Sequence, residues 1–133
     1  LSSAASDVYK RQEQYEACQK AGLVPKMVDG KMALIRQIDL DFVDAMGNTN
    51  LERMQKGLAA LDPATGEAYQ LHHIGQKMDS TLAILTRAEH MQNGNNEIWH
   101  LLGEATQIDR RVFERQREAF WKYMADLLTQ GGF

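Results

Sequence analysis

Alternating and helical runs of apolar residues divide the chain into short strands and helices. Residues 67–74 alternate between two faces, which predicts a strand. One face of this strand carries Tyr69, Leu71 and His73, and the other carries Gln70, His72 and Ile74. A second apolar run at 81–85 follows across a loop at 75–80, so the two runs together predict a β-hairpin.

Capping signals predict helices on both sides of this hairpin. Thr49 stands three residues before Glu52, and Thr86 stands three residues before Glu89, which is the spacing of a capping box. We therefore expect one helix over about 50–60 and another that begins at residue 87 and carries His90 in its first turns. The sequence Asn-Gly-Asn-Asn at 93–96 interrupts the second helix, and a further helix is expected to present His100.

Other segments carry weaker signals. Residues 7–21 are expected to form a helix that ends at Gly22. Residues 31–41 form a short apolar run that fits either a strand or a helix. The glycine and asparagines within 44–50 predict a loop, and Asp-Pro-Ala-Thr-Gly at 62–66 predicts a turn.

The longest predicted helix covers about 108–130. Its apolar residues repeat at helical spacing, and we interpret this stripe as core or as a surface that packs against a partner. The stripe consists of Phe113, Phe120, Met124 and Leu127. Basic residues in the same segment are balanced by acidic ones, so we interpret its polar side as a solvated face of mixed charge rather than as a nucleic-acid groove.

Composition limits the classes of protein to which the chain can belong. A length of 133 residues with 44% apolar residues predicts one domain with an ordinary core, and the elements above make it a small α+β domain. Cys18 is the only cysteine, which excludes an internal disulfide and a cysteine-based zinc site. The net charge of −3 argues against broad coating of nucleic acid, so any basic patch must be local. No apolar run approaches the roughly 20 residues of a membrane span.

The amino-terminal segment is set apart from the rest. Residues 1–12 resemble the translated product of a sequencing adapter, and an ordinary polar helix start is the alternative. We expect 1–12 to be non-native and 13–30 to be a linker or helix from a truncated upstream region. The functional domain is then expected to span 31–130.

The four histidines are the candidate functional residues, because all of them lie between positions 72 and 100. Imidazole is a common ligand of divalent metals and also transfers protons near neutral pH. A hairpin packed against a helix brings the end of the first strand close to that helix. His72 and His90 can then share an ion, while His73 points the other way and can take a proton from water. Nearby, Asp79 and Glu89 could orient an imidazole.

The same region resembles a known family. The string Gln70-Leu71-His72-His73-Ile74 is similar to the signature of the LHH family, nucleases of the HNH/endonuclease VII superfamily that form the carboxyl-terminal toxin domain of bacterial polymorphic toxins. The similarity covers roughly residues 31–125. It includes Gly47-Asn48-Thr49-Asn50-Leu51-Glu52-Arg53-Met54, Glu89-His90, His100 and the segment 111–121.

This resemblance implies a ββα-metal centre, HNH-like and related to the treble clef, with flanking helices and a long carboxyl-terminal helix. It implies that His73 is the catalytic general base and that His72, His90 and His100 bind or position a divalent ion such as Mg²⁺, Mn²⁺, Zn²⁺ or Ni²⁺. Candidate contacts to the substrate phosphate are Arg53, Lys77 and Arg87.

The predicted function is therefore that of a metal-dependent endonuclease, and the resemblance implies that it acts as a toxin. Its substrate would be DNA in preference to RNA, and its partner a cognate immunity protein. Its place of action would be the cytoplasm of a target cell reached by secretion or contact. The alternative is a non-catalytic helical interaction module in which the histidines hold a structural zinc ion, which would need four protein ligands and no spare base.

Overall fold

The computed structural model describes residues 3–74, 81–91 and 110–131, and within them the side chains of 12–74, 81–89 and 110–131. The helices and strands in chain order are α1 (Ser3–Lys20), β1 (Val24–Val28), β2 (Lys31–Ile35), α2 (Asn50–Gln55), β3 (Gln70–His73), β4 (Leu82–Leu85), α3 (Arg87–Met91) and α5 (Arg110–Thr129). This mixture of helices with a small sheet confirms the predicted α+β class. No helix in the described ranges is long and apolar enough to cross a bilayer.

The four strands form one mixed sheet in the order β1-β2-β4-β3. β1 and β2 form an antiparallel hairpin whose turn holds Asp29 at φ 54° and Gly30 at φ 72°. β2 then pairs in parallel with β4, and β4 pairs antiparallel with β3. The β3–β4 hairpin predicted from the sequence is therefore confirmed, and β3 lies at an edge of the sheet.

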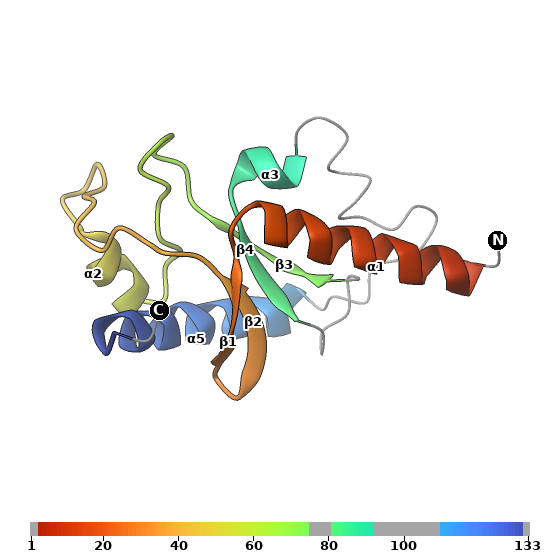
Figure 1. Cartoon of the computed structure of the whole chain (residues 1–133). Coiled ribbons are helices and arrows are strands. Elements are labelled where there is room, and N and C mark those ends of the chain that lie inside the picture. Colours follow the sequence, from red (N-terminus) through yellow and green to blue (C-terminus); the bar gives the residue numbers. More distant parts are fainter. Residues whose placement is uncertain (1–2, 75–80, 92–109, 132–133) are drawn as a thin grey trace.

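Helices cover both faces of the sheet, with α1 on one side and α5 on the other (Figure 1). On the α5 side, Leu82 and Ile84 of β4 pack with the predicted apolar stripe of α5. The stripe residues buried there include Phe120 and Met124, next to the fully buried Trp121. Of the two interpretations of the stripe, packing in the core is confirmed for Phe120 and Met124.

The α1 side has its own smaller core. Ala83 and Leu85, the alternate residues of β4, pack with Ile74 against Cys18 and Leu23. Burial of Cys18 raises the pKa of its thiol to about 12, and the nearby carboxylate of Glu89 adds to this effect. The helix that ends before Gly22 is therefore part of the packed domain.

The segment between the two hairpins is held by Asn50, whose side chain is completely buried. Its amide nitrogen donates to the carbonyl oxygens of Asp39 and Leu61 at 2.8 and 3.0 Å, and its amide oxygen accepts from the Leu61 amide at 2.8 Å. Three hydrogen bonds satisfy a polar group that would otherwise destabilise the core. Asn50 thus ties three distant backbone segments together.

Most of the predicted local features are present. Both capping boxes form: Thr49 accepts from the Glu52 amide, and Thr86 accepts from the Glu89 amide at 3.1 Å. The first of these helices, α2, ends earlier than expected, because Gly57 has φ 83°. The backbone of Gly57 also lies against Glu118: a Cβ on Gly57 would be only 3.2 Å from the Cβ of Glu118. The turn at 62–66 closes through a 2.7 Å bond from the Gly66 amide to the Asp62 carbonyl oxygen.

The structure resolves one ambiguous segment and differs from the expectation at another. The run at 31–41, which fitted either a strand or a helix, begins with strand β2, because pairing with β1 and β4 decides its conformation. Strand β1 lies within 13–30, where only a linker or helix was expected. The predicted loop at 75–80, the interruption at 93–96 and the helix around His100 fall outside the described residues.

We predict that Asn50→Ala lowers the free energy of unfolding by about 3 kcal/mol, because it leaves several buried backbone groups without partners. Urea denaturation of the purified chain measures the change. The matched control is Asn48→Ala, which removes one exposed contact to Lys56 and should cost less than about 1 kcal/mol. Equal losses in the two variants would contradict the role assigned to Asn50.

We also predict that Cys18 resists thiol reagents in the folded protein near neutral pH. The reagent needs the thiolate, which burial makes scarce, and the side chain is only 1% exposed. Labelling should become fast in urea, and a Cys18→Ser variant should not label under either condition. Rapid labelling of the native protein would show that α1 is not packed on the sheet as described.

Candidate active site

The Leu71-His72-His73 motif occupies strand β3, and its two imidazoles leave the strand in opposite directions. Side chains of successive strand residues point to opposite faces. His72 lies opposite Ala83 in the hairpin, on the side covered by α1, and His73 lies opposite Leu82, on the side covered by α5. The predicted division of faces is therefore confirmed, and each histidine meets a different helix.

His73 is 3% exposed and is held by α5. Its Nε2 lies 2.9 Å from Oε1 of Gln116, and its ring meets the Phe113 ring edge-on with 4.6 Å between centroids. Burial holds the pKa of His73 below the ordinary imidazole value, and the positive charge of Lys31 acts in the same direction. The Gln116 hydrogen bond opposes both without reversing them. His73 is therefore neutral at physiological pH, as a general base must be.

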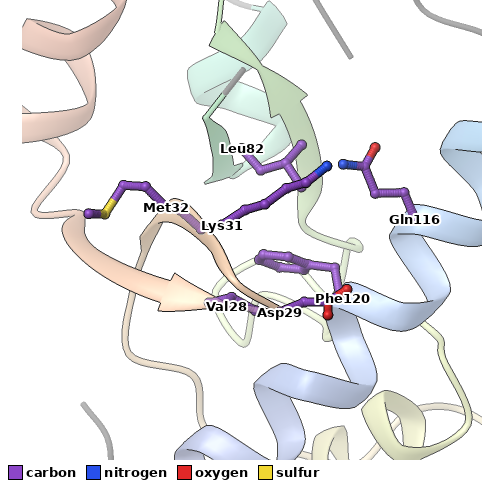
Figure 2. A pocket seen from close by; sticks show the side chains of 8 residues that line it. Val28, Asp29, Lys31, Met32, Leu82, Gln116 and Phe120 are labelled. Carbon is purple, nitrogen blue, oxygen red and sulfur yellow. The ribbon is translucent and has the colours of Figure 1, made fainter. Parts of the chain in front are cut away.

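A small pocket adjoins this arrangement between β2, β4 and α5. It has a volume of about 40 Å³, and Lys31, Gln116 and Phe120 contribute to its lining. Figure 2 shows the Lys31 side chain extending across the pocket so that its ammonium group approaches the Gln116 amide. The pocket has space for water but not for a larger ligand. The Lys31 ammonium group therefore lies close to Gln116, the residue that contacts His73.

His72 is held on the opposite side by α1. The ring is 5% exposed, and its Nε2 lies 3.3 Å from Oε1 of Gln14, a glutamine that is itself fully buried. Glutamine thus contacts both histidines of the motif, from α1 on one face and from α5 on the other.

Each of these two contacts joins a histidine Nε2 to a glutamine Oε1. A glutamine Oε1 only accepts, so each bond requires a hydrogen on the histidine Nε2. In a neutral ring the lone pair then lies on Nδ1. With Oε1 as the acceptor, the neutral forms of His72 and His73 are the same tautomer, protonated on Nε2.

Helix α3, which carries His90, is fixed to the sheet by Glu89. This carboxylate accepts from the Thr86 amide at 2.8 Å and forms an ion pair with Arg36, which follows β2. Arg36 also donates from Nε to the Ile84 carbonyl oxygen at 3.1 Å. Cap and ion pair together set the direction in which α3 leaves β4, and hence the position of the His90 backbone. The His90 side chain and all of His100 lie outside the described residues.

The predicted phosphate contacts occupy different environments. Arg53 donates to Asp44 at 2.8 Å and to the Ala59 carbonyl oxygen at 2.9 Å, so its guanidinium supports the loop around α2. Arg87 is largely exposed and forms a 3.4 Å ion pair with Glu67. Lys77 falls in a segment that the structure does not describe. The roles of all three in substrate binding stay predictions.

Three residues around the motif were not found from the sequence: Gln14, Lys31 and Gln116. Each is an ordinary polar residue at its place in the chain, and only the packing of α1, β2 and α5 brings them to the histidines. Among the described side chains, no three histidines, cysteines or carboxylates gather into a group that could hold a metal ion. The assignment of His72, His90 and His100 as ligands therefore also stays a prediction.

Comparison with known proteins agrees with this geometry. A sequence model of the family described as LHH, "a nuclease of the HNH/ENDO VII superfamily with conserved LHH", matches residues 49–126. No curated protein and no solved structure gave a match. The matched segment covers more than half of the chain and includes the β3–β4 hairpin, α3 and most of α5. The chain therefore belongs to the LHH family of HNH/ENDO VII superfamily nucleases.

Proposed function

We propose that this nuclease is a metal-dependent endonuclease in which His73 activates the attacking water. The observation that carries the proposal is the environment of His73: a neutral imidazole, buried in the family's motif, with its Nε2–H fixed by Gln116. In this tautomer Nδ1 has the lone pair and accepts the proton of water. The charge of Lys31 disfavours a second proton on the resting ring, which keeps the base ready for use.

His72 fits the role of a metal ligand, because burial makes an uncharged ligand preferable to a carboxylate. His90 and His100 would complete the set. The divalent ion, Mg²⁺, Mn²⁺, Zn²⁺ or Ni²⁺, would supply positive charge to the scissile phosphate and to the departing oxygen. Because β3 lies at the edge of the sheet, a phosphodiester that met both histidines would have to lie across that edge.

The biological setting is proposed from the resemblance to polymorphic toxin domains. The domain would act on DNA, in preference to RNA, within the cytoplasm of a target cell reached by secretion or contact. A cell that makes such an enzyme needs protection, so a cognate immunity protein would block the active site. The candidates for contact with the substrate phosphate remain Arg53, Lys77 and Arg87.

We predict that His73→Gln reduces plasmid cleavage by about 10²–10⁴-fold, since a general base contributes that much to hydrolysis. Glutamine keeps a polar side chain of related size but cannot take the proton. Circular dichroism establishes that the variant is folded, and an identical purification of both proteins reports any contaminating nuclease. Unchanged cleavage by His73→Gln would remove His73 from the mechanism.

We predict that EDTA abolishes cleavage while the far-UV circular dichroism spectrum is retained, and that adding back one of the four ions restores activity. An open catalytic site loses activity without its ion, whereas a closed structural zinc site loses its fold. Unfolding of the domain on chelation would favour the alternative of a zinc-stabilised interaction module. Cleavage that persists in EDTA would show that no metal is needed.

A further inference from the structure

A second and larger cavity lies on the same side of the sheet as His73. It has a volume of about 520 Å³ and is open to solvent between the turn after α2, strand β3 and the first half of α5. The turn approaches α5 closely because Gly57 has no side chain to meet Glu118. We call this cavity the α5 groove.

The α5 groove is continuous with the surroundings of His73. Leu71 and Tyr69 line it, and both lie on the His73 face of β3. Phe113 also lines the groove and, on its other side, touches the His73 ring with 4.6 Å between centroids. A ligand that fills the groove therefore comes within one aromatic ring of the proposed base.

Two arginines of α5 give the groove its positive charge. Arg110 and Arg117 both line it, and both are exposed. Within the described part of the chain, neither guanidinium forms an ion pair, and Arg117 lies 5.9 Å above the Phe113 ring. Stacking on the ring orients this guanidinium at little entropic cost. Glu118 also lines the groove and leaves it with a modest excess of positive charge.

We propose that the α5 groove binds one strand of the nucleic-acid substrate beside the phosphate that is cut. The proposal rests on the nuclease function and adds the place where the substrate is held. Seven residues of helix separate the two arginines by about 10 Å along the axis, so each reaches a different phosphate of one strand. The groove has the volume of a pocket for a small ligand, which suits part of a single strand and not a duplex.

The test is binding of a fluorescein-labelled poly-dT oligonucleotide to the full chain at several salt concentrations. The protein carries His73→Gln, so that the probe stays intact. Adding Arg110→Gln with Arg117→Gln should weaken binding by about tenfold or more, because phosphate contacts supply most of the affinity. It should also reduce the slope of log Kd against log salt by about 1.4, since each contact to a single strand contributes about 0.7.

The matched control is Arg115→Gln, which removes the same charge from the same helix at an exposed position that does not line the groove. Its affinity and salt slope should stay close to those of the parent. An unchanged Kd in the double variant, or an equal loss in the control, would overturn the proposed binding site, since net charge alone would then explain the data.

Cleavage kinetics separate this inference from the function on which it rests. With His73 intact, the double arginine variant should show a KM about tenfold higher or more and a kcat close to that of the unsubstituted chain. If the unsubstituted chain cleaves DNA and the double variant has the same KM, the groove proposal is wrong and the nuclease stands. If the unsubstituted chain does not cleave nucleic acid under any metal condition, the nuclease mechanism itself is wrong.

Discussion

The alternation of side chains along β3 is the constraint from which the rest of the site follows. Two adjacent histidines on one strand cannot share a face, so each needs its own polar partner inside its own core. Gln14 of α1 and Gln116 of α5 supply those partners. In the described part of the chain the sheet is covered on both sides, and each histidine of the pair lies beside one of the two hydrophobic clusters.

The electrostatics of the site are local and do not follow the overall charge. The whole chain carries a net charge of −3, yet Lys31 faces the His73 side of the sheet, and Arg110 and Arg117 line the adjoining groove. Lys31 therefore has two electrostatic effects: with burial, it lowers the pKa of His73, and it adds positive potential on this side of the sheet.

The sequence contained enough information to predict the hairpin, both capping boxes, the turn at 62–66 and the buried stripe of α5, because each depends on neighbouring residues. It also identified the histidine motif and the family. Strand β1 could not be predicted, since its strand form depends on pairing with β2. Gln14 and Gln116 were missed for a related reason: their importance comes from helix packing across 58 and 43 residues of chain. The polar side of α5 was interpreted as a solvated face of mixed charge. Arg110 and Arg117 differ from the other basic residues of α5 only because they line the groove beside β3, which the sequence does not reveal.

The hairpin that carries the LHH motif depends on strand β2 for its pairing. The family match begins at residue 49, but β4 is paired on its inner side by β2, at residues 31–35, and β2 is paired in turn by β1. A chain that began at residue 49 would lack β2. One side of β4 would then have no hydrogen-bond partners and could pair with other chains. The structural unit that completes the sheet in this chain therefore extends upstream of the matched segment, as far as β1.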